Sequence, residues 1–212
     1  MEWTEAGPGS HEIDGQEVHL WRFPSGTADQ LATTLGELLA PYTGSDPTDV
    51  EISTGAHGKP ELADPAGGIH FNLSHSGDWS VVAVARVAVG VDIERIDPRR
   101  PTTRLADRFL TAAERELVQA RAGSHGDAAF FIAWSRKEAY LKAVGVGLSV
   151  PFSHVDSAGA RLPELDEQGR QPEGTPPWAV AEFFVDDAHP GAVVARTEQL
   201  ALRSFTLRRS EA

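Results

Sequence analysis

The fold is decided between residues 69 and 94, which carry the sequence IHFNLSHSGDWSVVAVARVAVGVDIE. This stretch contains three apolar, β-branched runs, at 69–74, 79–86 and 89–94. Turn-forming residues separate the first two runs, and a short break follows Arg86. Strand-length apolar runs divided by such breaks predict hairpins. We therefore expect an antiparallel meander in this region.

The pattern on either side of the meander predicts both helices and strands. The expected elements are strands at 17–23, near 50–53, 178–185, 192–197 and 200–208, and helices at 27–40, 104–109, 111–122 and 127–144. Thr27 or Ser25 is expected to cap the first helix, which Pro41 should stop. Gly145 and Gly147 are expected to end the longest helix, as C-terminal glycines do.

Each half of the chain therefore combines helix with a few antiparallel strands, which predicts the α+β class. We expect the seam near 95–100, dividing the chain into residues 1–97 and 98–212.

Composition excludes several classes of protein. The 212 residues are 41% hydrophobic and 24% charged, which is enough for a packed core. A net charge of −12 argues against sequence-independent binding of nucleic acid. Without cysteine there is no disulfide scaffold, thiolate zinc site or cysteine nucleophile. No apolar run approaches the roughly 18 residues of a membrane span, and the N-terminal stretch is acidic and polar. We therefore expect a cytoplasmic protein with no membrane association.

A pair of carboxylates lies at the end of the third apolar run. Asp92 and Glu94 share one face of the expected strand, because successive side chains alternate. Two carboxylates on one face can hold a hard cation such as Mg²⁺. The alternative is a strand whose outer face is acidic because the whole protein is acidic.

The chain uses arginine far more often than lysine. Sixteen of the nineteen basic residues are arginine, and the lysines are Lys59, Lys137 and Lys142.

Glu138 and Lys142 lie on one stripe of the long helix, with Trp134 one turn earlier. The alternative is an ordinary i,i+4 ion pair worth about 0.3–0.5 kcal/mol.

Two further motifs are open to a structural and a functional interpretation. Ser74 and His75 precede a turn whose N–H groups suit a phosphate, although a Ser/Asn-rich turn needs no ligand. Adjacent strand residues face opposite sides, so these two cannot form a hydrolase Ser–His pair. Thr111 and Glu114 have the spacing of a capping box, which explains Glu114 without chemistry. Lys59 lacks the flanking residues of a P-loop, and the histidines lack the spacing of a zinc site.

The order of these motifs is more specific than any one of them. It resembles the 4′-phosphopantetheinyl transferase family, in its larger single-chain form that serves polyketide, nonribosomal peptide and fatty-acid carrier proteins. The matching segments are GKP at 58–60, FNLSHSG at 71–77, GVDIE at 90–94, RFLTAAE at 108–114 and WSRKEAYLKAVGVGL at 134–148.

The resemblance implies two similar α+β halves related by a pseudo-twofold, each with a small antiparallel sheet and a packed helix. Residues 1–97 would carry the nucleotide-contacting loops and the DxE strand, and residues 98–212 the WSxKEA helix. The coenzyme would bind between the halves.

The resemblance also assigns roles to individual residues. Asp92, Glu94 and Glu138 match the magnesium ligands. The implied catalytic residues are Glu138, Lys142 and Glu114, with either Glu138 or Glu114 as the base. The implied coenzyme A contacts are Lys59, Pro60, Ser74, His75, Lys137 and Lys142.

The implied reaction moves the phosphopantetheine arm of coenzyme A to a serine of an apo acyl or peptidyl carrier protein, with Mg²⁺ as cofactor. The partners are then the carrier and coenzyme A, with no nucleic acid or membrane, and we expect a monomer. The alternatives are a carrier-binding module that has lost catalysis and another Mg²⁺-dependent phosphotransferase.

The first 57 residues depart from the family pattern. Residues 24–57 contain no lysine or arginine, and Arg22 is the sole base upstream. The basic residues with which the family contacts the adenosine 3′-phosphate from this region are therefore missing here. Either Lys59 and His75 carry that phosphate, or the affinity for coenzyme A is modest.

An arginine-rich segment follows the acidic strand end, and it predicts the docking surface for carriers. Its members are Arg95, Arg99, Arg100, Arg104 and Arg108. Phe109 and Leu110 are expected to form the apolar centre of this surface. The alternative is a solvated linker that balances nearby acids.

Overall fold

The structure, a computed structural model, describes residues 1–8, 12–55, 59–63, 68–125, 128–146, 150–165, 170 and 177–208. Gly58 and Gly147, which belong to two of the sequence motifs, lie outside these residues. The described part forms two main β-sheets and four α-helices, so the α+β class is confirmed.

The first sheet has five strands within the described residues. In spatial order they are β1 (Thr4–Ala6), β11 (Ala201–Leu207), β2 (Glu17–Pro24), β6 (Trp79–Ala85) and β5 (His70–Ser76). The second sheet has four described strands: β7 (Val89–Ile93), β10 (Pro190–Ala195), β9 (Trp178–Phe184) and β8 (Arg161–Leu162). A small hairpin joins β3 (Ile52–Thr54) to β4 (Pro60–Leu62).

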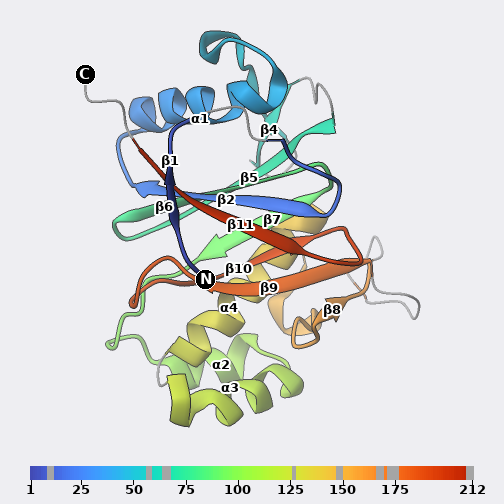
Figure 1. Cartoon of the computed structure of the whole chain (residues 1–212). Helices are drawn as coiled ribbons and strands as arrows, with labels where there is room; N and C mark the ends of the chain where they lie inside the picture. Colours follow the sequence, from blue (N-terminus) through green and yellow to red (C-terminus); the bar gives the residue numbers. More distant parts are fainter. Residues whose placement is uncertain are drawn as a thin grey trace.

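Helices cover the outer faces of both sheets (Figure 1). These are α1 (Ala28–Thr43) on the first sheet and α4 (Ala128–Val144) on the second, with α2 (Thr102–Phe109) and α3 (Ala112–His125) beside one end of α4. Short 3₁₀ turns occupy Pro47–Asp49 and Phe152–His154. Between the sheets, Leu20 of β2 shares a buried cluster with Val91 of β7. The layers therefore run helix, sheet, sheet, helix.

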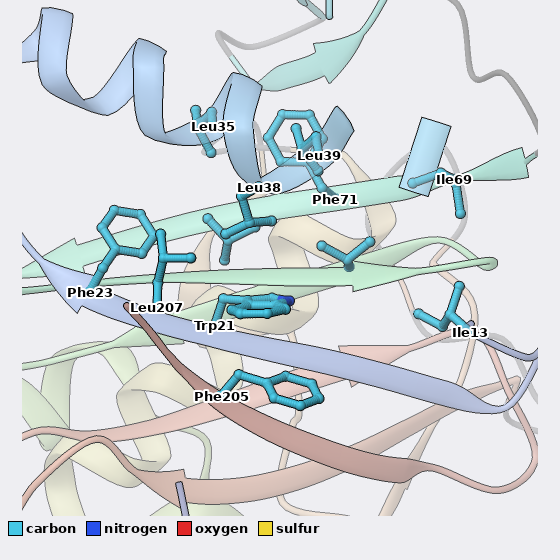
Figure 2. Close-up of a cluster of buried hydrophobic side chains, with 12 residues drawn as sticks. Ile13, Trp21, Phe23, Leu35, Leu38, Leu39, Ile69, Phe71, Phe205 and Leu207 are labelled. Atoms are coloured by element: carbon cyan, nitrogen blue, oxygen red, sulfur yellow. The ribbon is translucent and has the colours of Figure 1, made fainter. Parts of the chain in front are cut away.

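The core under α1 shows why this helix forms where it does. Leu35, Leu38 and Leu39 project from one face of α1 onto the sheet, where Trp21 and Phe205 are stacked at 4.6 Å (Figure 2). Burial of such side chains stabilises each by about 1.5–3 kcal/mol. The hydrophobic stripe, rather than helix propensity, therefore anchors α1.

The expectation that Pro41 ends the first helix is wrong. The helix continues to Thr43, and Gly44 closes it in the left-handed conformation at φ 70°. Tyr42 explains the extra turn, because its hydroxyl accepts a hydrogen bond from Trp21 Nε1 at 2.9 Å. Tertiary anchoring of Tyr42 thus outweighs the break that a proline introduces.

Two expectations about strand pairing are also corrected. The pair β5–β6 is antiparallel as expected, but β7 leaves the meander and pairs with β10 in the other sheet. The last strand, β11, is parallel to both β1 and β2, whereas antiparallel pairing was expected throughout. The first sheet therefore contains one strand from the C-terminal half, β11, and the second sheet one strand from the N-terminal half, β7. The division between 97 and 98 stays a prediction.

Among the described residues, no helix has the length and hydropathy needed to cross a membrane.

Candidate active site

A glycine allows the acidic strand to lie directly against α4. A Cβ placed on Gly90 would collide with the backbone oxygen of Ala139 and the backbone nitrogen of Ala143. Without a side chain at this position, β7 and α4 approach closely. This contact brings Glu138 and Lys142 of the helix to Asp92 at the end of the strand.

Asp92 is the centre of the resulting cluster. Its Oδ1 accepts hydrogen bonds from Lys142 Nζ at 2.7 Å and from Ser74 Oγ at 3.0 Å. Its Oδ2 is buried and has no hydrogen-bond partner among the described residues. A buried carboxylate oxygen without a partner is costly unless a ligand completes the site.

The two other carboxylates are electrostatically coupled to Asp92. Burial raises the pKa of Glu138 to about 7, and the charges of Asp92 and Glu94 add to that shift while Lys142 opposes it. Burial also raises the pKa of Glu94, with Asp92 adding to the shift and Arg100 opposing it. The charge of Asp92 disfavours the ionised forms of Glu94 and Glu138, and such a group of carboxylates would attract a cation.

A second lysine, Lys59, contacts the backbone of the helix that carries Lys142. Lys59 Nζ donates to the backbone oxygen of Lys142 at 3.1 Å, which holds the segment before β4 against the end of α4. Burial lowers the pKa of Lys59, and the nearby Lys142 charge lowers it further. Two like charges held close together favour an anion between or beside them. Pro60 follows at the start of β4.

A series of polar side chains on β5 contacts the backbone of β7. The backbone N–H of Val91 donates to Asn72 Oδ1 at 2.8 Å, and that of Ile93 donates to Ser74 Oγ at 3.2 Å. The N–H of Arg95 donates to Ser76 Oγ at 2.9 Å. Asn72 and Ser76 were not among the sequence-based candidates, although their spacing of two from Ser74 was a usable signal. His75, between them, is exposed on the opposite face.

The chemistry of the cluster fits a hard divalent cation. Carboxylate oxygens are the ligands that Mg²⁺ prefers, and Oδ2 of Asp92 is a buried carboxylate oxygen that has no hydrogen-bond partner among the described residues. The structure does not, however, gather three or more His, Cys, Asp or Glu side chains into a ready-made metal cluster anywhere in the described ranges. Lys142 instead occupies the other oxygen of Asp92.

Lys137 and Glu114 are not brought to this cluster. Lys137 Nζ lies 2.6 Å from Glu114 Oε2, with both side chains buried to 1% exposure or less. Glu114 also accepts from the Thr111 N–H, as a capping box requires, and from the N–H and hydroxyl of Ser157. Lys137 donates to two backbone oxygens, of Phe109 and Phe152. Both residues therefore have the partners of a structural ion pair.

The sole upstream base is used in packing. The Arg22 guanidinium lies 4.8 Å and 5.2 Å from the ring centroids of Trp3 and Trp79. It also donates to the backbone oxygen of Val185 and the hydroxyl of Thr206. Arg22 therefore does not supply the missing N-terminal phosphate contact.

The arginine-rich segment borders the acidic cluster as expected. A cavity of about 480 Å³ is lined by Ser76 and Glu94 together with Arg95, Arg99 and Arg100. Leu110, expected at the apolar centre of the patch, is only 2% exposed, so that expectation is wrong.

Phe109, the other expected centre of the patch, packs edge-on against Trp134 and remains half-buried.

Comparisons with known proteins identify the family of this chain. The model of the 4′-phosphopantetheinyl transferase superfamily matches residues 88–193. The 4′-phosphopantetheinyl transferase psf-1 of Bacillus pumilus is 37% identical over 175 residues, covering 79% of this chain and 72% of that protein. A 4′-phosphopantetheinyl transferase of Bacillus subtilis is 33% identical, covering 79% and 75%. HetI of Nostoc sp. is 29% identical, covering 84% and 86%.

A crystal structure of a Bacillus anthracis holo-(acyl-carrier-protein) synthase covers 53% of this chain and 97% of that one, at 24% identity and a TM-score of 0.36. This likeness is too distant to bear on the site. The family model and the relatives from Bacillus are decisive: the chain belongs to the 4′-phosphopantetheinyl transferase superfamily.

Proposed function

We propose that this phosphopantetheinyl transferase moves the phosphopantetheine arm of coenzyme A to a serine hydroxyl of an apo acyl or peptidyl carrier protein. The observation that carries the proposal is the environment of Asp92. One of its oxygens is held by Lys142 and Ser74, and the other is buried without a partner. Acidic and cationic groups placed this closely suit a cation and a polyphosphate bound together.

The cationic side of the site would receive the phosphates of coenzyme A. Lys142 and Lys59 supply two ammonium groups, each held by backbone oxygens, and Lys142 is also paired with Asp92. His75, exposed on the face of β5 opposite Ser74, would contact the adenosine 3′-phosphate from that side. Charge-assisted hydrogen bonds of this kind are roughly twice as strong as neutral ones.

Asp92, Glu94 and Glu138 would hold Mg²⁺. When bound, the ion would polarise the phosphate oxygens and neutralise part of their charge. Lys142 would then exchange part of its contact with Asp92 for a contact with the anion. The ammonium therefore keeps the carboxylate in place while the site is empty of substrate.

Glu138 would act as the general base. Burial raises its pKa to about 7 when no cation is bound, and the carboxylate oxygen not used by Mg²⁺ would accept the proton. The serine Oγ forms a bond to the β-phosphorus, the one attached to pantetheine, and the bond from that phosphorus to the bridging oxygen breaks. The serine proton passes to Glu138, and adenosine 3′,5′-bisphosphate leaves with the electron pair.

Glu114 is disfavoured as the base. Both of its oxygens already accept hydrogen bonds, and its ion pair with Lys137 is buried. Serving as a base would require this buried pair to open. We propose that Glu114 and Lys137 instead fix the start of α3 against α4.

The experiment is an intact-mass assay with coenzyme A, Mg²⁺ and a panel of apo carrier proteins. A gain of the phosphopantetheine mass on the carrier, lost in an Asp92→Ala variant that still unfolds cooperatively, supports the proposal. A carrier that binds without any change in mass indicates a module that has lost catalysis. Transfer at the wild-type rate by Asp92→Ala would contradict the site.

A further inference from the structure

Within the described residues, no strand pairs with the edge of β7 that faces β5. β7 ends the strand order of the second sheet among the described strands, with β10 on its other side. The N–H groups of Glu94 and Ile96 donate to Pro190 and Ala188 on that other side. In an antiparallel pair, alternate residues point away from the partner strand. The N–H groups of Val91, Ile93 and Arg95 therefore point towards β5.

Three side chains of β5 replace the missing strand. Asn72, Ser74 and Ser76 lie two residues apart, so they project from one face of β5. Each accepts the N–H of the residue nineteen positions later, at 2.8 Å, 3.2 Å and 2.9 Å. The periods of the two strands match, and every inward N–H from 91 to 95 is satisfied. We call these three residues the side-chain ladder.

The two serines of the ladder also contact the acidic residues directly. Ser74 Oγ donates to Asp92 Oδ1 at 3.0 Å, and Ser76 Oγ donates to Glu94 Oε2 at 3.4 Å. A hydroxyl can accept one hydrogen bond and donate another at the same time. A backbone strand in this place would satisfy the N–H groups through its carbonyl oxygens, but those oxygens cannot donate to a carboxylate.

We propose that Asn72, Ser74 and Ser76 are positioning residues that fix Asp92 and Glu94 in the orientation needed to hold a divalent cation. The ladder holds the backbone of β7, from which both carboxylates project, and it orients one oxygen of each carboxylate. This proposal rests on the proposed function, because it takes Asp92 and Glu94 as metal ligands. Residues that orient metal ligands change metal affinity or activity by about 10–100-fold when they are replaced.

The decisive variant is Ser76→Ala, because Ser76 is only half-buried and its loss should leave the fold intact. We expect the Mg²⁺ concentration for half-maximal transfer to rise about tenfold or more, with little change in KM for coenzyme A. The rise in melting temperature on adding Mg²⁺ without substrate should move to correspondingly higher concentration. Ser76→Thr, which keeps the hydroxyl, should restore both values.

A matched control separates positioning from simple loss of stability. Ser80→Ala removes a buried hydroxyl on β6 that contacts Ser25 and not β7. It should lower the melting temperature without changing the Mg²⁺ response. If Ser76→Ala behaves like Ser80→Ala, with an unchanged Mg²⁺ requirement in both assays, the ladder is purely structural and the proposal is wrong.

Amide hydrogen exchange tests the ladder independently of catalysis. In Asn72→Ala the amide of Val91 should exchange faster than in the wild type, while that of Glu94, bonded to the other side, stays protected. Equal protection of Val91 in the variant would overturn the ladder.

The Asp92→Ala variant distinguishes the two proposals. Loss of transfer there together with an unchanged Ser76→Ala would reject the ladder alone. Unimpaired transfer by Asp92→Ala would reject the metal assignment itself.

Discussion

The ammonium of Lys142 lies 2.7 Å from Oδ1 of Asp92, across the contact between α4 and β7. Lys142 shares a helix stripe with Glu138, but the ion pair it makes is with the strand. The pair is partly buried, with exposed fractions of 30% for the Lys142 side chain and 8% for that of Asp92. It therefore connects the two elements that carry the acidic residues.

Replacing Lys142 by alanine should impair transfer more than folding. Loss of a donor aimed at developing negative charge costs about 10²–10³-fold in kcat. The change also leaves Asp92 without its cation, so we expect a lower melting temperature as well. Steady-state kinetics and thermal melting measure the two effects. A variant with wild-type kcat and only a lower melting temperature would show that Lys142 is purely structural.

Stability without metal should depend on the ionisation of Glu138. Its pKa in the folded protein is about 7, above the ordinary value of 4.5, because of burial and the neighbouring carboxylates. The folded state therefore binds more protons than the unfolded chain between these values, and stability falls as pH rises from about 4.5 to about 7. Melting temperatures in a chelator should show this fall, and Glu138→Gln should flatten it.

The same ionisation predicts how Mg²⁺ acts. A cation favours the charged carboxylates, so added Mg²⁺ should raise the melting temperature more at pH 8 than at pH 5. A response to Mg²⁺ that does not depend on pH would contradict the assignment of Glu138 to the metal.

The buried pair of Lys137 and Glu114 should matter for stability and not for chemistry. Removing one member of a buried ion pair costs about 3–5 kcal/mol, because the other charge is left unpaired. Urea unfolding of Lys137→Met should show a loss of this size. Lys137→Met combined with Glu114→Leu should be less destabilised than the sum of the single changes.

Glu114→Gln addresses the choice of base. The amide oxygen can still accept from the Thr111 N–H, whereas the amide nitrogen cannot accept from Ser157, so the variant should be less stable. The protein that remains folded should transfer at nearly the wild-type kcat. A large loss of kcat in folded Glu114→Gln would make Glu114 the base in place of Glu138.

The arginine-rich segment should affect the carrier and not coenzyme A. Arg95 and Arg104 are both exposed, and within the described residues neither guanidinium has an acidic partner. Reversing both to glutamate should raise KM for an acidic carrier and leave KM for coenzyme A unchanged. Salt should weaken use of the carrier by the wild type, because exposed charges are screened beyond about 8–10 Å. An unchanged carrier KM at low salt would contradict this docking surface.

Local patterns predicted most of the secondary structure, because period and turn residues are local properties. They did not predict the partner of each strand. The meander 69–94 looks continuous in sequence, yet β7 pairs with β10, about a hundred residues later. The direction of a strand relative to its neighbour cannot be predicted from the pattern either, since the alternation of β11 is the same whether it runs parallel or antiparallel to β2.

The candidate site was also predicted only in part, because a local motif does not show which way each side chain points. Asp92, Glu94, Glu138 and Lys142 are placed together, as the motifs implied. The resemblance grouped Lys137 with the coenzyme A contacts because it belongs to the same helix motif as Lys142, but five residues along a helix turn the side chain by about 140°. That rotation carries Lys137 into the buried pair with Glu114, away from Lys142.

The position of β11 between β1 and β2 governs when the molecule can finish folding. Translation at about 5–20 residues per second leaves residues 17–24 waiting roughly 10–40 s for residues 201–207 to be made. Until then β2 has an open edge, and β7 must also wait for β10. The nascent chain therefore has an incomplete first sheet and no assembled acidic site during most of its synthesis, and activity should appear only after the last strand has been added.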